Sequence, residues 1–303
     1  MIQEHRGFII KRKDGSEIVN YDDESFPSYI YDGYIFSGCT WEKVPHYHDD
    51  VEFISIYSGE MGYSVNGMNI TLKKGDTLFV NADAIHYSFS TNKYVTRYYL
   101  AVLHPSIICS SFAVEKKAIR PILSDKEVPY VHFQNGDHDA EAMQTLLKDM
   151  HLNAKGNEFL ITKYFFELWD ILSHRFTDNY RVLIKRKDED DTHNKALKAM
   201  MLFIDKNYNQ GINLKDIAES GGVSQTLCNQ IFNKLTDKSP IEYLMHYRSR
   251  KAADLLQTGS MSMTEIAETA GFSGASYMAE VFKKYYNMSP RDYRKSLIAK
   301  QKK

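Results

Sequence analysis

The chain has 303 residues, of which 43% are hydrophobic and 25% are charged, a composition typical of folded proteins that excludes a largely disordered chain. The length predicts two domains. The formal net charge of −1 conceals an asymmetry: residues 194–303 carry 17 Lys and Arg against 10 Asp and Glu, whereas residues 1–193 carry 21 against 29. The basic part favours a nucleic-acid partner. The three cysteines are scattered and show no spacing typical of a disulfide framework or a metal site, so we expect a cytoplasmic protein. No stretch is apolar enough to span a membrane, so we expect no membrane partner.

Residues 1–110 show the pattern of short β-strands. Runs rich in Tyr, Ile, Val and Phe alternate with turn residues, and the clearest runs are 29–36, 51–57, 69–72, 77–80 and 94–102. Asn66-Gly67 between two apolar runs predicts a two-residue hairpin turn. Many short strands at this spacing predict a sandwich or a barrel.

Helical periodicity begins near residue 138 and continues through 157–176, where apolar residues recur every three or four positions. This second stretch is expected to pack on the barrel or to form the seam of a homodimer. The charged run 185–191 follows and is typical of a linker. We therefore predict a first domain at residues 1–185, a linker at 186–194 and a helical domain at 195–299.

The last third of the chain contains an internal repeat. Residues 217–224 read IAESGGVS and residues 266–273 read IAETAGFS, and matching Phe, Lys and Ser-Pro residues follow each copy. A repeat indicates one supersecondary unit used twice. Each copy reads as a helix, a glycine turn and a second helix, which is the pattern of a helix-turn-helix. Two such units predict contact with double-stranded DNA at two neighbouring sites, and a purely structural packing unit is the alternative.

In the first unit, Gly221-Gly222 permits a left-handed turn and Ser224 can cap the second helix. The predicted outer surface of that helix is rich in amides. Such side chains can offer paired donors and acceptors to the major-groove edge of adenine. The residues that we assign to this DNA-binding surface are Gln225, Thr226, Asn229, Gln230 and Asn233.

The matching helix of the second unit is predicted to bury Tyr277, Met278, Val281 and Phe282. Its outer surface has few long hydrogen-bonding side chains, so we expect mainly phosphate contacts and close backbone fit there, although a carboxylate can accept from cytosine. Lysines supply the charge for the phosphate contacts. The residues assigned to this surface are Ala275, Ser276, Ala279, Glu280, Lys283 and Lys284.

The segment 243–256 joins the two units. It contains no Gly or Pro and shows helical periodicity, so we predict one rigid helix. A stiff connector fixes the distance between the two reading helices. Successive major-groove faces on one side of B-DNA lie ~34 Å apart.

Residues 195–297 resemble the DNA-binding domain of the AraC/XylS family of bacterial transcription regulators. The resemblance is carried by the Ile-Ala starts and glycine turns of both units, by the two Phe-x-Lys segments that end in Ser-Pro, and by Arg248, Ala252, Leu255 and Leu256 of the connector. It implies seven helices, with two recognition helices in adjacent major-groove segments. By position it implies base-reading roles for Thr226, Asn229 and Gln230, and for Ala275, Ser276, Ala279 and Glu280.

His46 and His48 are two residues apart, so on a strand they share a face, and Glu52 has the same parity. With the later His86 they resemble the two motifs of the cupin barrel, where such side chains can converge on a divalent metal. Three imidazoles and a carboxylate can bind Fe, Mn, Zn or Ni, whereas the alternative is a polar pocket without metal. We expect no metal cofactor and instead a small effector, with carbohydrate as first candidate. The predicted effector-pocket residues are His46, His48, Glu52, His86, Trp41 and Tyr34.

Together these features predict an α+β protein of two domains, a cupin-like β-barrel with appended helices followed by an all-α domain with two helix-turn-helix units. The predicted function is a non-enzymatic, sequence-specific transcription regulator that a small effector controls through the barrel. The alternative is a metal-dependent cupin enzyme with an accessory DNA-binding domain.

Overall fold

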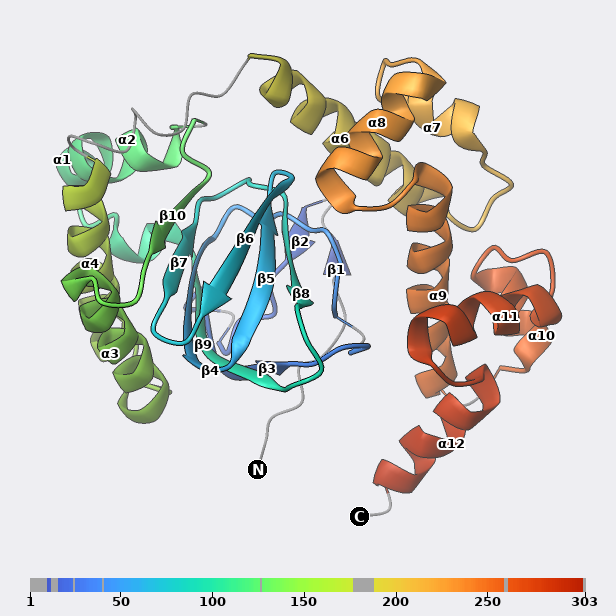
Figure 1. The fold of residues 1–303 in the computed structure, drawn as a ribbon, viewed down its shortest axis with the longest axis horizontal. Coiled ribbons are helices and arrows are strands. Elements are labelled where there is room, and N and C mark those ends of the chain that lie inside the picture. Colours follow the sequence, from blue (N-terminus) through green and yellow to red (C-terminus); the bar gives the residue numbers. More distant parts are fainter. Residues whose placement is uncertain are drawn as a thin grey trace. The chain divides into compact units, whose positions relative to one another are not determined.

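The computed structural model describes residues 10–11, 16–23, 25–39, 41–125, 127–176, 188–258 and 261–301. It divides into two compact units, one formed mainly by residues 1–191 and the other mainly by residues 192–303 (Figure 1). The first is rich in strands and the second is helical, as predicted. Within the described ranges, no helix is long and apolar enough to cross a lipid bilayer.

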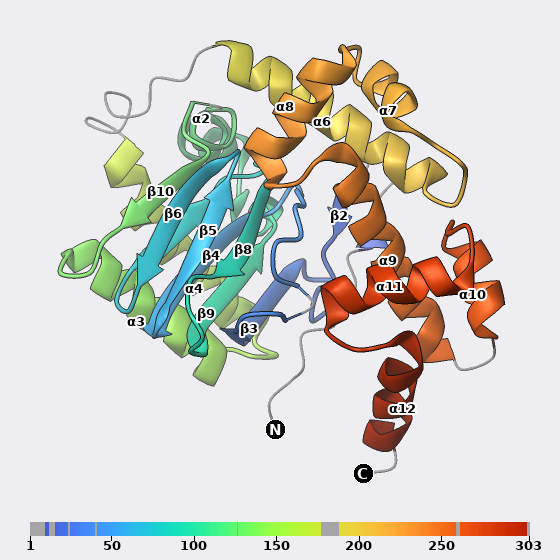
Figure 2. The same cartoon turned by 45° about the vertical axis from the view of Figure 1, so that its right-hand side comes forward.

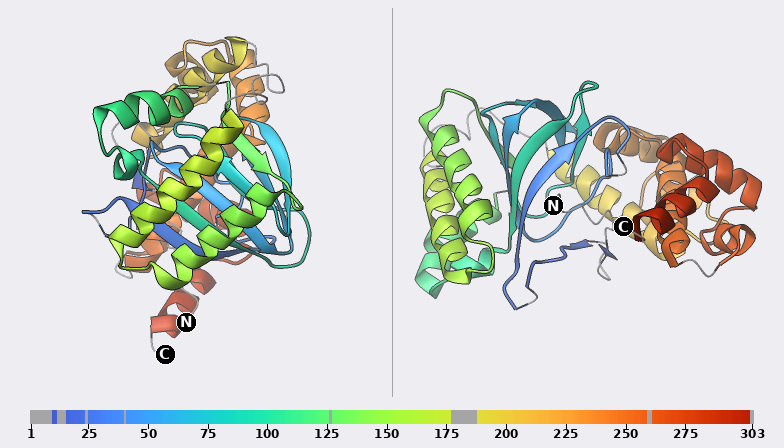
Figure 3. Two further views of the ribbon diagram at one scale, coloured as in Figure 1. Left: turned by 90° about the vertical axis from the view of Figure 1, so that its left-hand side faces the viewer. Right: turned by 90° about the horizontal axis from the view of Figure 1, so that it is seen from below.

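The first unit contains two antiparallel sheets that face each other (Figure 3). The five-stranded sheet has the order β10-β7-β4-β9-β3 and the three-stranded sheet the order β6-β5-β8. A separate pair, β1 with β2, precedes them in the chain. The strands are β1 (Ile10–Lys11), β2 (Glu17–Ile18), β3 (Ser28–Ile35), β4 (Val51–Ser58), β5 (Glu60–Val65), β6 (Met68–Lys73), β7 (Thr77–Val80), β8 (His86–Ser90), β9 (Thr96–Leu103) and β10 (Tyr130–Phe133).

Helices α3 (His138–Asn153) and α4 (Glu158–Phe176) cover one face of the five-stranded sheet (Figure 3). Because side chains alternate along a strand, Phe53 and Phe79 point to this face, where Phe53 packs against Phe165 and Phe79 against Trp169 of α4. Each fully buried side chain of this size contributes roughly 1.5–3 kcal/mol to folding. The prediction that this helical region packs on the barrel is confirmed.

The other face of the five-stranded sheet looks toward the three-stranded sheet, and Glu52 lies on it beside Tyr63 of β5. The predicted hairpin joins β5 to β6, and both of its turn residues have positive φ, 49° for Asn66 and 77° for Gly67. This backbone suits the right-handed twist of the two strands. The hairpin therefore folds as its two residues predicted.

The segment between the barrel strands and α3 holds elements that the sequence did not predict. They are β10 and four short helical pieces, namely η1 (Pro105–Ile108), α1 (Phe112–Val114), η2 (Glu115–Ile119) and α2 (Arg120–Leu123). The pieces α1, η2 and α2 follow one another without a break over residues 112–123. The π-helical turn between the two α-helical pieces shifts the helical period, so no regular apolar repeat marks this stretch in the sequence.

The second unit has seven helices in the part of the chain that is described, as the family resemblance implied. They are α6 (Asp188–Asn207), α7 (Leu214–Ser220), α8 (Gln225–Thr236), α9 (Pro240–Thr258), α10 (Met263–Thr269), α11 (Ala275–Tyr286) and α12 (Pro290–Gln301). The predicted connector is one uninterrupted helix, α9.

Helix α6 begins inside the segment predicted as a linker, because residues 188–194 are helical. The charged run that is typical of a linker therefore belongs in part to a helix. Residues 186 and 187 of the predicted linker lie outside the described residues.

Candidate nucleic-acid interface and metal centre

The two repeated units begin with the same cap chemistry. Asn213 caps α7 and Ser262 caps α10, and in both cases the carboxylate three residues later accepts from the backbone N–H of the cap residue. Such capping boxes satisfy two backbone donors that a helix start leaves unpaired. The turn glycines Gly222 and Gly271 have φ values of +66° and +81°. Both units thus form the predicted helix, left-handed turn and second helix.

Helix α8 exposes the amide-rich surface that the sequence predicted. Its inner residues Cys228, Ile231 and Phe232 are buried. Asn229 is half-buried, and its Nδ2 donates to the carbonyl oxygen of Gln225 at 3.0 Å, so part of its amide is used within the helix. The exposed members of the surface are Gln225, Thr226, Gln230 and Asn233.

Helix α11 buries Met278 and Phe282 and presents small and charged residues outward. Ala275 and Ala279 are half-buried, and the exposed members are Ser276, Glu280, Lys283 and Lys284. The prediction that Tyr277 is part of the inside was wrong, since its side chain is 43% exposed. Its ring touches Phe272 edge-on at the border of the core, a position that helical periodicity alone does not separate from the interior.

Helix α9 contacts both helix-turn-helix units. Tyr243 packs on Phe232 of α8, and His246 stacks on Tyr285 of α11 with 4.5 Å between ring centroids. Figure 2 shows α8 and α11 lying along different parts of α9. The connector helix therefore contacts both reading helices directly.

A second tie runs through Arg248 of α9. It is buried, and it donates to the carbonyl oxygens of Tyr208 and Gln210, both at 2.7 Å. The same Tyr208 oxygen lies 2.4 Å from where a Cβ on Gly271 would stand. The turn of the second unit is therefore packed directly against the chain that follows α6.

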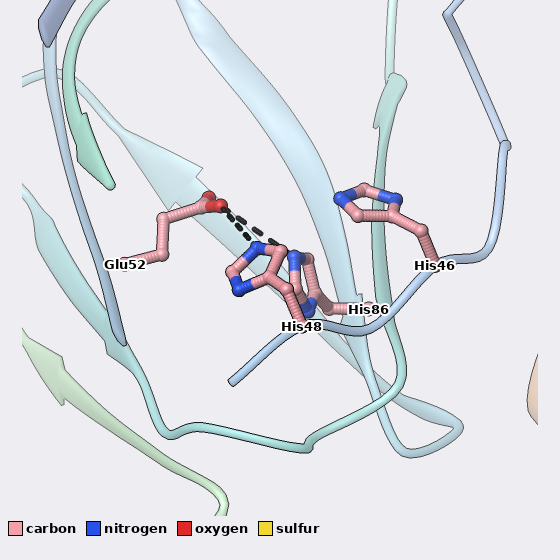
Figure 4. Close-up of side chains that lie close together, drawn as sticks. All are labelled: His46, His48, Glu52 and His86. Carbon is pink, nitrogen blue, oxygen red and sulfur yellow. Dashed lines mark ion pairs between the residues drawn. The ribbon is translucent and has the colours of Figure 1, made fainter. Parts of the chain in front are cut away.

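The strand-rich part of the protein, formed mainly by residues 1–191, contains a second candidate site. Its side chains are His46, His48, Glu52 and His86, which we call the imidazole–carboxylate cluster (Figure 4). One potential ligand atom from each side chain lies within 4.8 Å of all the others. Glu52 comes from β4 and His86 from β8, whereas His46 and His48 precede β4. His46 also pairs with His86 through both backbone N–H···O bonds, which fixes the segment before β4 to the start of β8.

All three imidazoles of the cluster are oriented in the same way. Their Nδ1 atoms bond to backbone carbonyl oxygens, of Val44 for His46 (2.8 Å), of Asp50 for His48 (3.1 Å) and of Ala84 for His86 (2.9 Å). A carbonyl oxygen can only accept, so each Nδ1 must carry the hydrogen. Each neutral ring then keeps its Nε2 lone pair for the cluster. Backbone bonds of this kind fix the tautomer and orientation of metal-binding histidines.

The electrostatics of the cluster centre on Glu52. Its Oε2 lies 3.5 Å from His86 Nε2 and 4.0 Å from His48 Nε2, and its Oε1 accepts from the Tyr63 hydroxyl. Burial alone would raise the pKa of Glu52, but His86, Tyr63 and His46 together lower it. Burial and the neighbouring imidazoles hold the pKa of His46 well below its usual value, so this ring is neutral near pH 7. For His86, the Glu52 carboxylate outweighs burial and raises the pKa.

These residues fit a divalent metal. Buried His86 Nε2 has no hydrogen-bond partner closer than the 3.5 Å contact with Glu52, which is too long for a normal bond. Ligands about 2.1 Å from one metal are separated by about 3.0–3.5 Å at the usual angles. The ligand atoms of the cluster lie within 4.8 Å of one another, so the most widely separated ones would have to move closer on metal binding. Three imidazoles with one carboxylate suit Fe, Mn, Ni or Zn.

Comparison with known proteins gives two matches. A Helix-turn-helix domain matches residues 217–296 and a Cupin domain matches residues 39–101. The HTH-type transcriptional regulator YdeC of Bacillus subtilis is 25% identical over 82% of this chain and 85% of its own length. The melibiose operon regulatory protein of Escherichia coli is 22% identical over 82% of this chain and 83% of its own. Over most of its length the chain is similar to AraC/XylS-type transcription regulators, and it combines a helix-turn-helix domain with a cupin domain.

A solved structure of fatty-acid-bound ToxT from Vibrio cholerae is also similar, with 12% identity, a TM-score of 0.44, and coverage of 88% of this chain and 95% of that one. The two domain matches fall on the predicted helix-turn-helix and cupin parts of the chain.

The structure brings together four of the six predicted effector-pocket residues, namely His46, His48, Glu52 and His86. Tyr34 does not join them. Tyr34 of β3 pairs with Arg97 of β9, one position beyond the Gly33–Tyr98 pair. Gly33 lies on the same face of the sheet as Glu52, so the Tyr34 side chain points to the opposite face. The sequence could not reveal this, because the alternation of a strand does not say which parity faces inward. Trp41 is half-buried and is not one of the four cluster residues.

Two residues beside the cluster escaped the sequence analysis. Tyr63 of β5 donates to Glu52, and Glu17 of β2 lies with its Oε2 3.6 Å from His46 Nε2. Neither stands near the His-x-His motif in the sequence, and strand pairing alone brings Tyr63 there. No spacing signal pointed to either one.

Proposed function

We propose that this AraC/XylS regulator binds specific DNA sequences through α8 and α11 and that a small effector in the barrel controls this binding. The observation that carries the first part is the exposed amide surface of α8, together with the exposed lysines of α11, on two helices that both pack against α9. Amide side chains read base edges, and lysines neutralise phosphates. The effector acts only by its differential affinity for the two states of the protein.

The DNA-binding proposal is tested with a fragment from upstream of the gene and a scrambled control of equal length. We expect binding to the native fragment to be at least about 10³-fold tighter at physiological salt, the lower end for specific regulators. Affinity for both fragments should fall as salt rises, because phosphate contacts release counterions. Equal affinity for the two fragments across the salt series would contradict sequence-specific regulation.

For the effector, we propose that the imidazole–carboxylate cluster is its site. Carbohydrate remains the first candidate, and the melibiose operon regulatory protein among the relatives bears the name of a sugar operon. The three Nε2 atoms favour a second candidate, a divalent metal held by the cluster. Such a metal would supply a Lewis-acidic centre for the oxygen atoms of a small ligand.

Metal analysis of the purified full-length protein tests the second candidate. We expect close to one Mn, Fe, Ni or Zn per chain, lost in His86→Ala and retained in His174→Ala, a control on the exposed part of α4. Absence of metal after reconstitution would leave the cluster as a binding site for an organic effector. Turnover of a small substrate by the metal-loaded protein would favour the cupin-enzyme alternative.

We further propose that α4 forms the seam of a homodimer. Phe159 is 84% exposed and Phe166 39% exposed, and the two lie seven residues apart on one side of the helix. Large exposed apolar groups on a helix face are typical of protein interfaces. Light scattering should give a dimer for the native chain and a monomer for Phe159→Asp with Phe166→Asp. Monomers in both cases would contradict this seam.

A further inference from the structure

One turn of α9 contacts both reading helices of the helical domain. Tyr243 of this turn packs on Phe232 of α8, with 5.4 Å between ring centroids. Three residues later, His246 stacks on Tyr285 of α11 at 4.5 Å, with the two rings 24° from parallel. Residues three apart are neighbours on a helix surface. We call these four side chains the aromatic bridge, because they connect α8 to α11 through a single turn of α9.

Tyr285 contacts α9 through both its ring and its hydroxyl. The ring lies against the His246 imidazole, and the hydroxyl donates to the backbone carbonyl oxygen of Glu242 at 3.2 Å. The neighbouring Lys284 Nζ lies 3.8 Å from the Glu242 carboxylate, an exposed ion pair that adds little stability by itself. The same carboxylate accepts from the backbone N–H and the hydroxyl of Ser239, just before α9. A stack and two polar contacts therefore attach α11 to the beginning of α9.

The aromatic bridge is buried where it crosses α9. Phe232 is fully buried, and Tyr243 and His246 are 5% and 8% exposed. Burial, with the positive charges of Lys238 and Arg250, holds the pKa of His246 well below its usual value, so the imidazole is neutral and packs as an aromatic ring. Close-packed side chains transmit displacements, because one cannot move without its neighbours. A shift of α11 along α9 is therefore resisted by a packed path that leads to α8.

The two ends of the aromatic bridge lie beside residues that we assign to the DNA-binding surface. Phe232 immediately precedes Asn233 in α8, and Tyr285 immediately follows Lys284 in α11. B-DNA turns by about 34° per base pair, because one turn contains about 10.5 base pairs. Two helices that are held at one separation and orientation therefore fit one spacing of their DNA segments better than a spacing that differs by a base pair.

We propose that Tyr285 is a positioning residue, which determines through the aromatic bridge the spacing of the two DNA segments that α8 and α11 contact. The inference rests on the proposed DNA binding through these two helices. It gives Tyr285 a part in specificity although this side chain belongs neither to the base-reading set nor to the phosphate-contacting set.

The test measures the affinity of the full-length protein for the native upstream fragment and for two derivatives. In these, one base pair is inserted or deleted midway between the segments that the native protein protects from nuclease cleavage. The variants are Tyr285→Leu, which removes the stack and the hydroxyl, and Tyr285→Phe, which removes the hydroxyl alone. The matched control is Tyr286→Leu, because the Tyr286 ring stacks on Phe282 of the same helix and contacts Tyr293 of α12. Urea unfolding records the stability of each variant.

We expect the native protein to bind each altered spacing about 10-fold or more weakly than the native fragment, as for a mismatched site. In Tyr285→Leu this penalty should shrink by about 3-fold or more, because the aromatic pair is lost, and Tyr285→Phe should lie between the two. Tyr286→Leu should lose stability but keep the native penalty, which separates positioning from folding.

Native-size penalties in every Tyr285 variant that folds would overturn the role of Tyr285 and leave the DNA binding intact. Equal affinity of the native protein for all three spacings would overturn it as well. Failure of the native protein to prefer its own fragment over the scrambled one would overturn both this role and the proposed function.

Discussion

The two helix-turn-helix units share a backbone plan but present different chemistry to a partner. Both start with a capping box and turn at a glycine with positive φ. Helix α8 then exposes Gln and Asn side chains, whereas α11 exposes Ser, Glu and Lys. A few cap and turn residues are thus enough to specify the fold of each unit, and the outer surface is left to vary. We interpret α8 as the main base reader and α11 as the phosphate contact.

The units also differ in how their turns are supported. A Cβ on Gly222 would meet nothing within 4 Å, whereas one on Gly271 would lie 2.4 Å from the Tyr208 oxygen and 2.7 Å from the Asn209 Cα. The first turn is open at Gly222, although its neighbour Gly221 packs against Met200, whereas the second turn is packed against backbone at Gly271. The same substitution should therefore have unequal effects in the two units.

The largest expected effect is that of Gly271→Ala. The backbone atoms around it cannot yield as a side chain would, so we expect a loss of about 3 kcal/mol or more in the free energy of unfolding. Gly222→Ala should cost only roughly 1–2 kcal/mol, the penalty of the left-handed backbone itself. Urea unfolding of the full-length variants, followed by helical circular dichroism, measures both. Equal losses would mean that the two turns are equally supported.

A smaller effect on stability is expected at Asp254, in the part of α9 that packs on the second helix-turn-helix unit. Burial raises the pKa of Asp254 to about 6, against the partial relief that Lys251 and Arg250 provide. An acid whose folded pKa is raised adds stability below its unfolded pKa and loses it as pH rises through the folded value. Asp254→Asn should therefore stabilise the protein by roughly 1–3 kcal/mol at pH 7 and by progressively less toward pH 4. A gain that does not change with pH would show that Asp254 does not titrate in this range.

The smallest effects concern the caps of the reading helices. Ser224 accepts from the Leu227 N–H at 3.2 Å, whereas α11 begins at Gly274 without a side-chain cap. Ser224→Ala should cost about 1 kcal/mol, and Gly274→Ser should add a few tenths, because its backbone is extended and a Cβ there meets nothing within 4 Å. Thermal unfolding of the two variants checks the signs. Destabilisation by Gly274→Ser would indicate that the second helix-turn-helix unit requires a residue without a side chain at position 274.

The features of the helical domain that the sequence predicted are those that depend on residues close together in the chain. Capping, glycine turns and apolar periodicity act within a few positions, so the helices and the outward set of α8 followed from the repeat. Tyr277 was misplaced because a residue at the edge of an apolar stripe shows the same spacing as one inside it.

The barrel was less predictable for a physical reason. Two histidines of the cluster were evident from their spacing, but Tyr63 reaches it through the pairing of β5 with β8, and Glu17 through the backbone hydrogen bond from its N–H to the Tyr47 carbonyl oxygen. The inward face of β3 depends on its register with β9, and so Tyr34 was assigned to the wrong side. Pairing partners and register are long-range properties that a single sequence does not encode locally.

The comparison between α8 and α11 is tested most directly by measuring DNA affinity for two paired variants on the native and scrambled fragments. Asn229→Ala with Gln230→Ala should reduce the preference for the native fragment by about 10-fold or more while leaving scrambled binding unchanged. Lys283→Ala with Lys284→Ala should weaken binding to both fragments alike and lower the salt slope by about 2. If the lysine pair instead abolished the preference and the amide pair left it intact, the assignment of reading to α8 and anchoring to α11 would be contradicted.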